Sequence, residues 1–161
     1  MVRLLRHAFI PDWLARRSFP SDALERIGQA IAGSERLHYG EICFAIEGGL
    51  PLQALSASCR ERAEELFGLL RVWDTAENCG VLLYVQLVDR DIEIVADRGI
   101  AARVPQSEWE EICRAMEEAF RQRRFVEGTM EAIERVTTLL AKNFPAEGLN
   151  RNELPDRPRL L

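Results

Sequence analysis

The chain alternates between short, continuously apolar runs and longer stretches with one apolar face. Residues 41–47 (EICFAIE) and 80–88 (GVLLYVQLV) are apolar at most positions, a pattern typical of strands that are covered on both faces. Residues 58–73, between them, carry large apolar side chains at the three-and-four spacing of a helical face. A strand, a helix and a second strand in this order predict a parallel pair joined by a crossover.

A third strand, over residues 91–97, follows the second too closely to be reached by a crossover connection. The two strands must therefore form an antiparallel hairpin, which we expect to close at Asp89 and Arg90. That closure places Leu82 opposite Asp97. The third strand alternates only partly between apolar and polar residues, so we expect it at the edge of the sheet.

Asp89 and Asp91 form an Asp-x-Asp pair directly after a buried strand, where haloacid-dehalogenase-type phosphatases carry their nucleophile. Such an enzyme would need a loop and a helix after the pair. Residues 92–95 (IEIV) instead continue as a strand, and aspartate is a frequent turn residue. The pair therefore indicates the tip of a hairpin more strongly than it indicates a catalytic site.

Helices with one apolar face are expected on both sides of these strands. Ser21 can cap the first of them, and Ser107 with Glu110 forms a capping box for the third. The fold class is therefore α/β: a small mixed sheet, made of a parallel crossover pair and an antiparallel hairpin, sandwiched between helices in an α/β/α arrangement. The expected helices span residues 21–33, 58–73, 107–124 and 126–143.

A length of 161 residues is typical of one domain, and 47% apolar with 29% charged residues describes a globular chain. We assign residues 1–20 to a basic N-terminal arm, residues 21–145 to the single domain, and residues 146–161 to an extended C-terminal tail. No apolar run in the sequence approaches the about 18 to 20 residues that a membrane helix requires.

The N-terminal arm carries a net charge of +3, so the remainder of the chain sums to -8. An acidic body does not favour nucleic acid as a partner. The arm lacks the continuous apolar centre of an export signal, so we expect a cytoplasmic protein. Its arginines could lie on an anionic membrane surface at the inner face of the membrane. Packing against the domain explains the same residues and is favoured, because Pro11 interrupts the amphipathic face.

The four cysteines show no Cys-x-x-Cys pairing, and the two histidines lie far from them in the sequence. This spacing supports neither a zinc site nor a disulfide framework, and it favours buried free thiols in a reducing compartment. No nucleophile motif accompanies His38, which we expect to be a surface or packing residue. The cysteines are Cys43, Cys59, Cys79 and Cys113.

The stretch 78–100, NCGVLLYVQLVDRDIEIVADRGI, resembles the core of TPM domains. In that family an Asn or Asp and a Gly precede a buried VLL strand, and an Asp-Arg turn, a third strand and a Gly-containing loop follow it. The Phe-Pro pair at 144–145 is similar to the one that ends the last helix of the family, and the tail NELPDRP (152–158) is similar to that of short bacterial members. The resemblance covers residues 24–145.

The resemblance implies metal binding and weak phosphatase activity, because relatives include thylakoid acid phosphatase proteins and membrane-anchored bacterial forms. In those relatives the third strand usually ends in Gly-Tyr-Gly. Here it ends in Ala96-Asp97-Arg98-Gly99, of which only Gly99 corresponds. A phosphate-binding loop needs exposed backbone N–H groups, and Asp97 would repel phosphate unless a cation intervened. This departure argues against phosphatase activity.

The expected topology also predicts where a polar site can form. Asp74, Glu77, Asn78 and Asp97 should gather at the end of the sheet opposite the turn, and their oxygens suit Ca²⁺ or Mg²⁺. Asn78 lies roughly 13 Å beyond Leu82 along a strand, which argues against one ion shared by all four residues. Helix capping and loop solvation are the alternative roles for these side chains.

Arg98, Gly99 and Arg103 form a candidate site for phosphate or another anion, with a solvated or salt-bridged surface as the alternative. The sequence pairs no nucleophile with a base, so we expect an accessory or interaction module that serves a membrane-associated protein partner. The alternative is a weak acid phosphatase that is assisted by Ca²⁺ or Mg²⁺ and acts through Asp97, Asn78 and Arg98.

Overall fold

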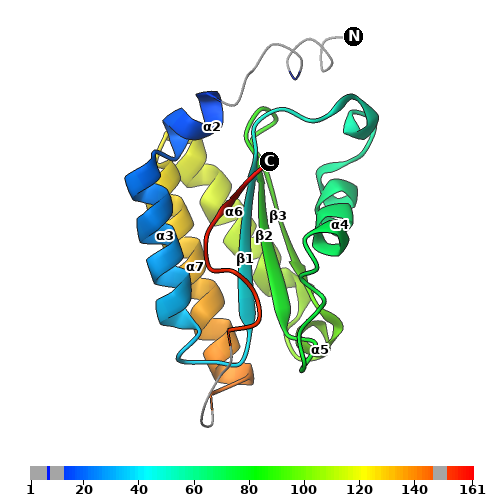
Figure 1. Ribbon diagram of the computed structural model, residues 1–161, viewed down its shortest axis with the longest axis vertical. Coiled ribbons are helices and arrows are strands. Elements are labelled where there is room, and N and C mark those ends of the chain that lie inside the picture. The colour runs from blue at the N-terminus through cyan, green and yellow to red at the C-terminus, as the bar shows by residue number, and fades with distance from the viewer. Residues whose placement is uncertain (1–6, 8–12, 147–151) are drawn as a thin grey trace.

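A mixed four-stranded sheet with helices on both faces makes up the domain (Figure 1). The computed structural model describes residues 7, 13–146 and 152–161. Its helices are α2 (Trp13–Ser18), α3 (Ser21–Ser34), the 3-10 helix η1 (Leu52–Ala54), α4 (Cys59–Leu69), α5 (Arg98–Ala101), α6 (Gln106–Arg121) and α7 (Phe125–Asn143). Its strands are β1 (Glu41–Glu47), β2 (Gly80–Gln86), β3 (Asp91–Ala96) and β4 (Arg159–Leu160).

The strands lie in the order β3-β2-β1-β4. β1 and β2 are parallel, in register from Glu41 with Gly80 to Glu47 with Gln86, and α4 lies between them in the chain. β2 and β3 are antiparallel, and β3 is an edge strand. The α/β/α class, the parallel crossover pair and the hairpin are therefore confirmed.

The hairpin closes in a different register from the one expected. β2 ends at Gln86, which pairs with Asp91, so a four-residue turn replaces the expected two-residue turn. Leu82 consequently pairs with Val95, and its expected pairing with Asp97 was wrong.

The residues of the turn explain why the ladder stops early. Leu87 and Val88 are buried apolar residues that lie in the turn rather than in the ladder. The Gln86 side-chain oxygen accepts the backbone N–H of Asp89 at 2.7 Å and so closes the turn. Arg90 then adopts a left-handed backbone, with φ of 60°.

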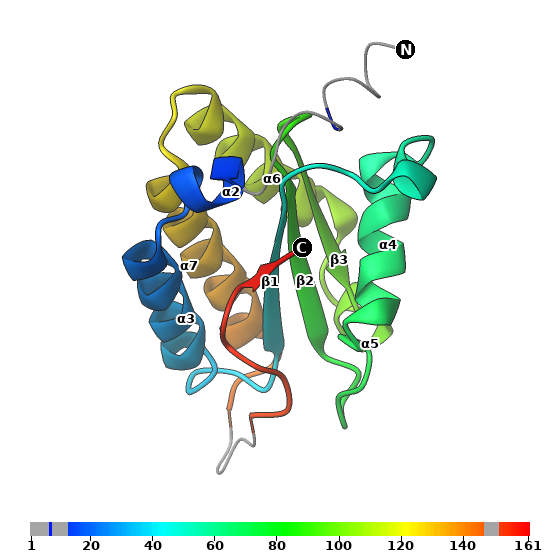
Figure 2. The same ribbon diagram turned by 45° about the horizontal axis from the view of Figure 1, so that its top comes forward.

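Hydrophobic cores lie on both faces of the sheet. The larger core lies between the sheet and helices α3, α6 and α7 (Figure 2). Phe19, which follows α2, is fully buried in this core, and its ring meets that of Phe44 edge-on at a centroid distance of 5.8 Å. The smaller core lies between the sheet and α4, where Leu66 packs with Leu82 and Tyr84. β1 and β2 are thus buried on both faces, as their apolar sequences predict.

Proline, and not serine, occupies the N-cap of two helices. α3 follows Pro20 and α6 follows Pro105, and neither cap residue makes a side-chain hydrogen bond. The caps expected at Ser21 and at Ser107 were therefore wrong. Proline favours the extended backbone of an N-cap position. Each helix therefore begins one or two residues earlier than a serine N-cap would allow, and the expected capping serines lie inside the helices. A capping box forms instead at Ser58, before α4.

The C-terminal tail is partly built into the sheet. Arg159 and Leu160 form β4, which runs parallel to β1 opposite Ala45 and Ile46, and Leu154 is buried in the smaller core. Neither this strand nor the short helices α2 and α5 were expected from the sequence. The rest of the predicted N-terminal arm and of the tail lies outside the described residues, at 1–6, 8–12 and 147–151. In the described part of the chain, no helix is both long and apolar enough to cross a membrane.

Candidate functional site

A cavity of about 620 Å³ is lined by residues that include Cys79, Gly99 and Phe144. Cys79 directly precedes β2 and Gly99 lies in α5, and this is the end of the sheet opposite the hairpin (Figure 1). Three of the predicted site residues line the cavity: Glu77, Gly99 and Arg103. The parallel strands begin at this end, whereas ligands of open α/β sheets usually bind where the strands end. The lining also includes Tyr39, Cys79, Phe144 and Glu153.

Asp97 lies at the junction of β3 and α5. Its backbone N–H donates to the carbonyl of Gly80 at 2.8 Å, and its Oδ1 accepts the N–H of Arg98 at 2.7 Å and so caps α5. The Oδ2 atom is buried, and no donor in the described part of the chain lies within hydrogen-bonding distance of it. A buried carboxylate oxygen without a donor is a group that a cation could satisfy.

Gly99 allows α5 to lie directly on the loop that precedes β2. A Cβ atom at this position would lie 2.5 Å from the carbonyl oxygen of Asn78 and 2.8 Å from that of Glu77. The Gly99 N–H donates to the same Asn78 carbonyl at 3.1 Å. In the observed register Asp97 lies opposite Gly80, and not opposite Leu82 as expected. Asn78 is therefore two positions, and not four, from the residue that faces Asp97. The structure therefore brings these two predicted residues together.

The two predicted anion-binding arginines are engaged in contacts within the fold. The Nε and Nη2 atoms of Arg98 donate to Asn78 Oδ1 at 3.0 and 2.9 Å. Arg103 Nη1 donates to the carbonyl of Asn143 at 2.8 Å, and its guanidinium lies 4.5 Å from the centroid of the Phe144 ring. Both arginines hold the loops around the cavity, and their binding of an anion stays a prediction.

The four predicted metal ligands do not form one cluster of carboxylates. Asp74 forms an ion pair with Arg71 in an exposed turn. Across the described residues, no three His, Cys, Asp or Glu side chains are arranged to hold a metal ion. A cation at Asp97 would therefore need amide and carbonyl oxygens, such as those of Asn78 and Glu77, to complete its coordination.

Asp89 and Asp91 lie at the hairpin, as the turn interpretation predicts. Asp91 begins β3, and its carboxylate accepts the N–H of Ile92 at 3.1 Å. His7 Nδ1 accepts the N–H of Leu50 at 3.0 Å, so its Nε2 carries the proton and donates to Asp89 at 3.2 Å. The residues directly after the pair form β3 and not a loop and a helix, which excludes the arrangement expected for a haloacid-dehalogenase-type nucleophile.

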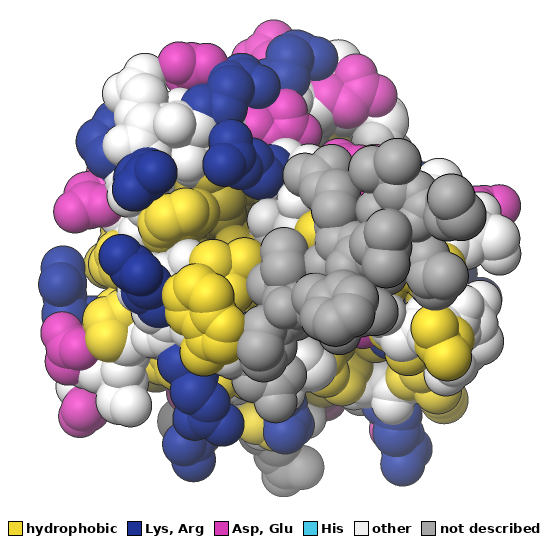
Figure 3. Space-filling model, turned by 90° about the horizontal axis from the view of Figure 1, so that it is seen from above, with side chains coloured by type: hydrophobic (Ala, Val, Ile, Leu, Met, Phe, Trp, Pro, Cys, Tyr) yellow, Lys and Arg dark blue, Asp and Glu magenta, His cyan; other side chains and the backbone are white. Residues whose placement is uncertain are grey.

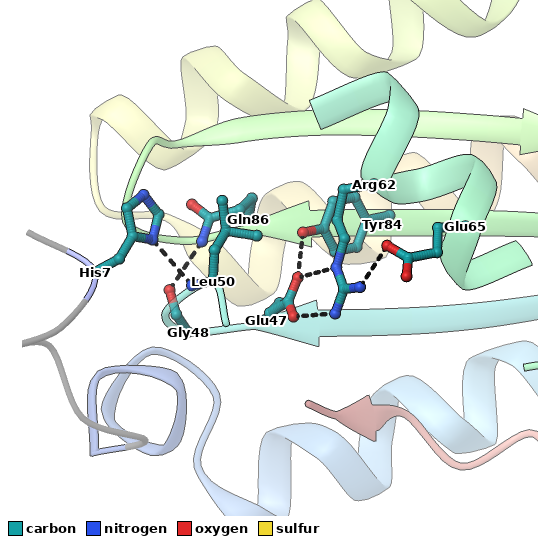
Figure 4. Close-up of polar contacts among 8 residues, drawn as sticks. All are labelled: His7, Glu47, Gly48, Leu50, Arg62, Glu65, Tyr84 and Gln86. Carbon is teal, nitrogen blue, oxygen red and sulfur yellow. Dashed lines mark hydrogen bonds and ion pairs between the residues drawn. The ribbon is translucent and has the colours of Figure 1, made fainter. Parts of the chain in front are cut away.

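A buried ionic network that the sequence analysis missed lies at the end of β1 (Figure 4). Arg62 donates to both oxygens of Glu47, from Nε at 3.1 Å and from Nη2 at 2.6 Å. The Tyr84 hydroxyl donates to the same carboxylate at 2.6 Å, and Arg62 Nη1 reaches Glu65 at 2.7 Å. Glu47 is 2% exposed and Arg62 is 8% exposed. The only signal in the sequence was a charged residue at the end of an apolar strand.

This network has the chemistry of a structural clamp. The hydrogen bonds of Arg62 to Glu47 raise the pKa of Arg62. Burial is the main cause that raises the pKa of Tyr84, and the hydrogen bond to Glu47 adds to it. Both groups therefore keep their protons at neutral pH. The network joins α4 to β1 and β2. Because three hydrogen bonds already engage the Glu47 carboxylate, this group is not available as a general base for a substrate.

Buried acidic residues attach the C-terminal tail to the start of β1. Glu41 Oε2 accepts the N–H of Leu154 at 3.0 Å. Glu35 accepts the N–H of Ile42 at 3.3 Å and shares a hydrogen bond with the carboxyl group of Asp156. Burial raises the pKa of Glu35 to about 9, and it also raises the pKa of Glu41. Glu35 is thus protonated at neutral pH and can donate to Asp156.

The cysteines and His38 are packing residues, as expected. All four cysteines are buried and free, and burial raises the pKa of Cys43 to about 11 and that of Cys113 to about 12. Their thiols therefore stay protonated and poorly nucleophilic. His38 is fully buried beside the carbonyl of Gly40, with its Nδ1 atom at 2.9 Å from that oxygen, and burial lowers its pKa.

The fold and the position of the cavity define a small α/β/α domain whose polar cavity lies at the start of its parallel strands. The sequence matches the family model of the TPM domain over residues 18–139, and the chain therefore belongs to the TPM domain family. The expectation that the resemblance raised is thus confirmed at the level of the family. No curated protein matches the sequence.

Two solved structures are similar to this chain. The BA42 protein from the psychrophilic bacterium Bizionia argentinensis matches with a TM-score of 0.78 and 28% identity, over 88% of this chain and 94% of that one. The N-terminal domain of a protein from P. gingivalis matches with a TM-score of 0.61 and 18% identity, over 86% of this chain and 95% of that one. The second likeness shows the fold alone.

Proposed function

We propose that this TPM domain is a binding module, not a hydrolase, and that it serves a membrane-associated protein partner. One observation carries the proposal: the arginines expected to hold phosphate are already used within the fold. Arg98 is bound to Asn78, and Arg103 is bound to the Asn143 carbonyl and the Phe144 ring. A phosphate ester would have to displace these contacts before either guanidinium could bind it.

The cavity is the candidate binding surface for the partner. Its volume of about 620 Å³ lies within the range of ligand pockets in proteins. Tyr39 and Phe144 contribute aromatic surface, and Glu77 with Glu153 places two carboxylates beside the single positive charge of Arg103. This lining favours a partner segment that carries a basic residue next to an apolar one.

A site-specific crosslink tests the proposal. A photoreactive amino acid is introduced at Glu77 in the cavity lining, and at exposed Glu64 on α4 as the matched control. We expect the probe at 77 to form an adduct with one protein, and we expect Glu153→Arg to abolish this adduct by reversing the charge of the cavity. An adduct of equal yield from position 64, or one insensitive to Glu153→Arg, would reject the cavity as the binding surface.

A phosphatase assisted by a divalent metal is the second candidate, and the buried Oδ2 atom of Asp97 favours it. Asp97, the Asn78 side chain and the Glu77 carbonyl could hold Ca²⁺ or Mg²⁺, and Arg98 could orient phosphate if it turned away from Asn78. The cation would act as a Lewis acid on the phosphoryl oxygen.

Metal titration separates the two candidates. If a cation binds at Asp97, Ca²⁺ or Mg²⁺ at about a hundred times its Kd stabilises the fold by about 2.7 kcal/mol, which is measured as a rise in melting temperature. Asp97→Asn should abolish the rise, whereas Asp74→Asn, which changes an exposed ion pair, should retain it. Metal-dependent hydrolysis of a phosphate ester that Asp97→Asn abolishes would establish the phosphatase and overturn the binding-module proposal.

A further inference from the structure

Arginines gather at the hairpin end of the molecule, where three separate elements meet. α2 contributes Arg16 and Arg17, the hairpin contributes Arg90, and the end of α6 with the following turn contributes Arg121, Arg123 and Arg124. All six are exposed, although the whole chain has a net charge of -5. Figure 3 looks onto this end and shows basic side chains around a central group of apolar ones. We call these six residues and Trp13 the arginine face.

A groove of about 530 Å³ runs through the arginine face. Arg17, Arg90, Arg121 and Arg123 line it, together with Trp13 and other apolar residues, and Glu127 adds one negative charge. The lining therefore has a formal net charge of +3. A concave basic surface with an apolar floor is unusual on an acidic protein and indicates an anionic binding partner.

Most of this positive charge is not paired with any acidic residue that the structure describes. In the described part of the chain, Arg17, Arg90 and Arg123 form no ion pair. Arg121 pairs with Glu118 at 2.9 Å and Arg124 pairs with Glu131 at 3.9 Å, and both carboxylates are more than half exposed. Exposed pairs of this kind are weak, so they leave most of the attraction for a partner.

The backbone at two of these positions does not favour arginine. Arg90 and Arg123 have φ values of 60° and 61°, in the left-handed region where glycine and asparagine are preferred. Arg71 also has a left-handed backbone, but its side chain is paired with Asp74. At the hairpin end, two turn tips therefore carry arginines against their local conformational preference, and neither arginine is paired with a described acidic residue.

Trp13 indicates what kind of anionic surface fits. Its side chain is 51% exposed and lies on α2 beside Arg16 and Arg17. Indole rings are enriched at membrane–water interfaces, where the ring contacts apolar surface and its N–H remains in the polar layer. Arginines around such a ring can extend their guanidinium groups to lipid phosphates.

We propose that the arginine face docks on an anionic lipid membrane, with lipid phosphates in the groove and Trp13 in the headgroup layer. The arginines come from three elements without a common spacing, which suits a fluid surface that imposes no register better than it suits one protein segment. This inference takes only one point from the proposed function, namely that the protein works at a membrane. The surface it assigns lies at the opposite end of the molecule from the cavity, so the two ends would contact lipid and protein partner at the same time.

Sedimentation with protein-free vesicles tests the inference. The full chain is mixed with vesicles of about 30 mol% phosphatidylglycerol in phosphatidylcholine, and with pure phosphatidylcholine vesicles. We expect binding to the anionic vesicles alone, and its loss when salt is raised from about 0.1 M to about 1 M, because the Debye length falls from about 10 Å to about 3 Å. Equal binding to both vesicle types, or no binding to either, would overturn the proposal.

Matched variants locate the surface. Arg17→Gln with Arg90→Asn and Arg123→Asn should weaken binding by more than about tenfold, since each basic residue near an anionic surface contributes a several-fold effect. Asparagine suits the left-handed backbone, so these changes should leave the melting temperature unchanged or raised. The control replaces three exposed arginines elsewhere by glutamine: Arg26, Arg36 and Arg114. If both triple variants lose equal binding, net charge rather than the arginine face explains the interaction.

Two tryptophans provide a second control pair. Trp13→Ala should weaken vesicle binding several-fold, whereas Trp73→Ala, at 50% exposure, should leave it unchanged. The opposite result would reject the assignment of Trp13. If the chain does not bind protein-free vesicles but the photoreactive probe at position 77 still crosslinks to a protein, this inference is overturned and the proposed function stands.

Discussion

At the scale of single residues, the Glu47–Arg62–Tyr84 network shows how burial decides the role of a polar group. A glutamate at the end of β1 would be a candidate base if its oxygens faced a cavity. Here Arg62 and Tyr84 occupy both oxygens, and the carboxylate is 2% exposed. The group therefore stabilises the junction of α4 with the sheet.

Removing one partner of this network should destabilise the fold strongly. Arg62→Met leaves the Glu47 carboxylate buried without its cation, and we expect the free energy of unfolding to fall by about 3 to 5 kcal/mol. The control, Arg114→Met, breaks an exposed pair at 3.9 Å and should change that free energy by less than about 1 kcal/mol. Urea unfolding measures both.

The double variant Glu47→Gln with Arg62→Met completes this test. Replacing the buried charge by a neutral amide removes most of the penalty, so the double variant should be more stable than Arg62→Met alone. If Arg62→Met lost less than about 1 kcal/mol, the Glu47 carboxylate would have to find other donors or accept a proton, and the clamp role would be wrong.

At the scale of elements, hydrophobic periodicity predicted the helices and strands correctly wherever the same face of a long segment is buried along its whole length. The bounds of β1 were predicted to the residue, because an apolar run bounded by Glu41 and Glu47 fits a strand covered on both faces. The hairpin was predicted as antiparallel, but its register depended on whether Leu87 and Val88 stay in the ladder. An apolar pattern cannot decide this, because turn residues can be buried too, as these two are.

The short elements and the candidate site show the limits of this reasoning. β4 and α5 span two and four residues, too few for any periodicity to appear. The topology predicted that Asn78 and Asp97 lie at the same end of the sheet, but the expected register placed Asn78 roughly 13 Å beyond the residue opposite Asp97. The close approach of Gly99 to the backbone of Asn78 was not predicted. The contact of Arg98 with Asn78 depends on the side-chain geometry of two segments, which no spacing in the chain encodes.

At the scale of the whole molecule, the C-terminal tail links stability to pH. Its segment from Leu154 to Leu160 runs along β1, from the contact of Leu154 with Glu41 to the pairing of Arg159 and Leu160 with Ala45 and Ile46. Two buried glutamates, Glu35 and Glu41, hold it, and Asp156 faces Glu35. The pKa values of both glutamates are raised in the folded chain. Folding therefore takes up protons here, and the fold loses stability as these protons leave.

The sign of the effect follows from Glu35. Between its ordinary pKa of 4.5 and its folded pKa of about 9, the folded chain holds a proton that the unfolded chain has lost. The stabilisation is complete below about pH 4.5, and the free energy of unfolding then falls by at most about 1.4 kcal/mol per pH unit until about pH 9. We expect urea unfolding to show a chain that is more stable at about pH 5 than at about pH 8.5.

Glu35→Gln should remove much of this dependence. Glutamine stays neutral and can still donate to Asp156, so the variant should match the parent chain near pH 5 and exceed it in stability near pH 8.5. Glu25→Gln, on the exposed face of α3, is the matched control and should leave the slope unchanged. Parallel stability curves for the parent chain and Glu35→Gln would show that Glu35 is already ionised in the folded state. The tail would then be held by its other contacts, which include those of Glu41 with Leu154 and of Glu153 with Ala76 and the β4 pairing.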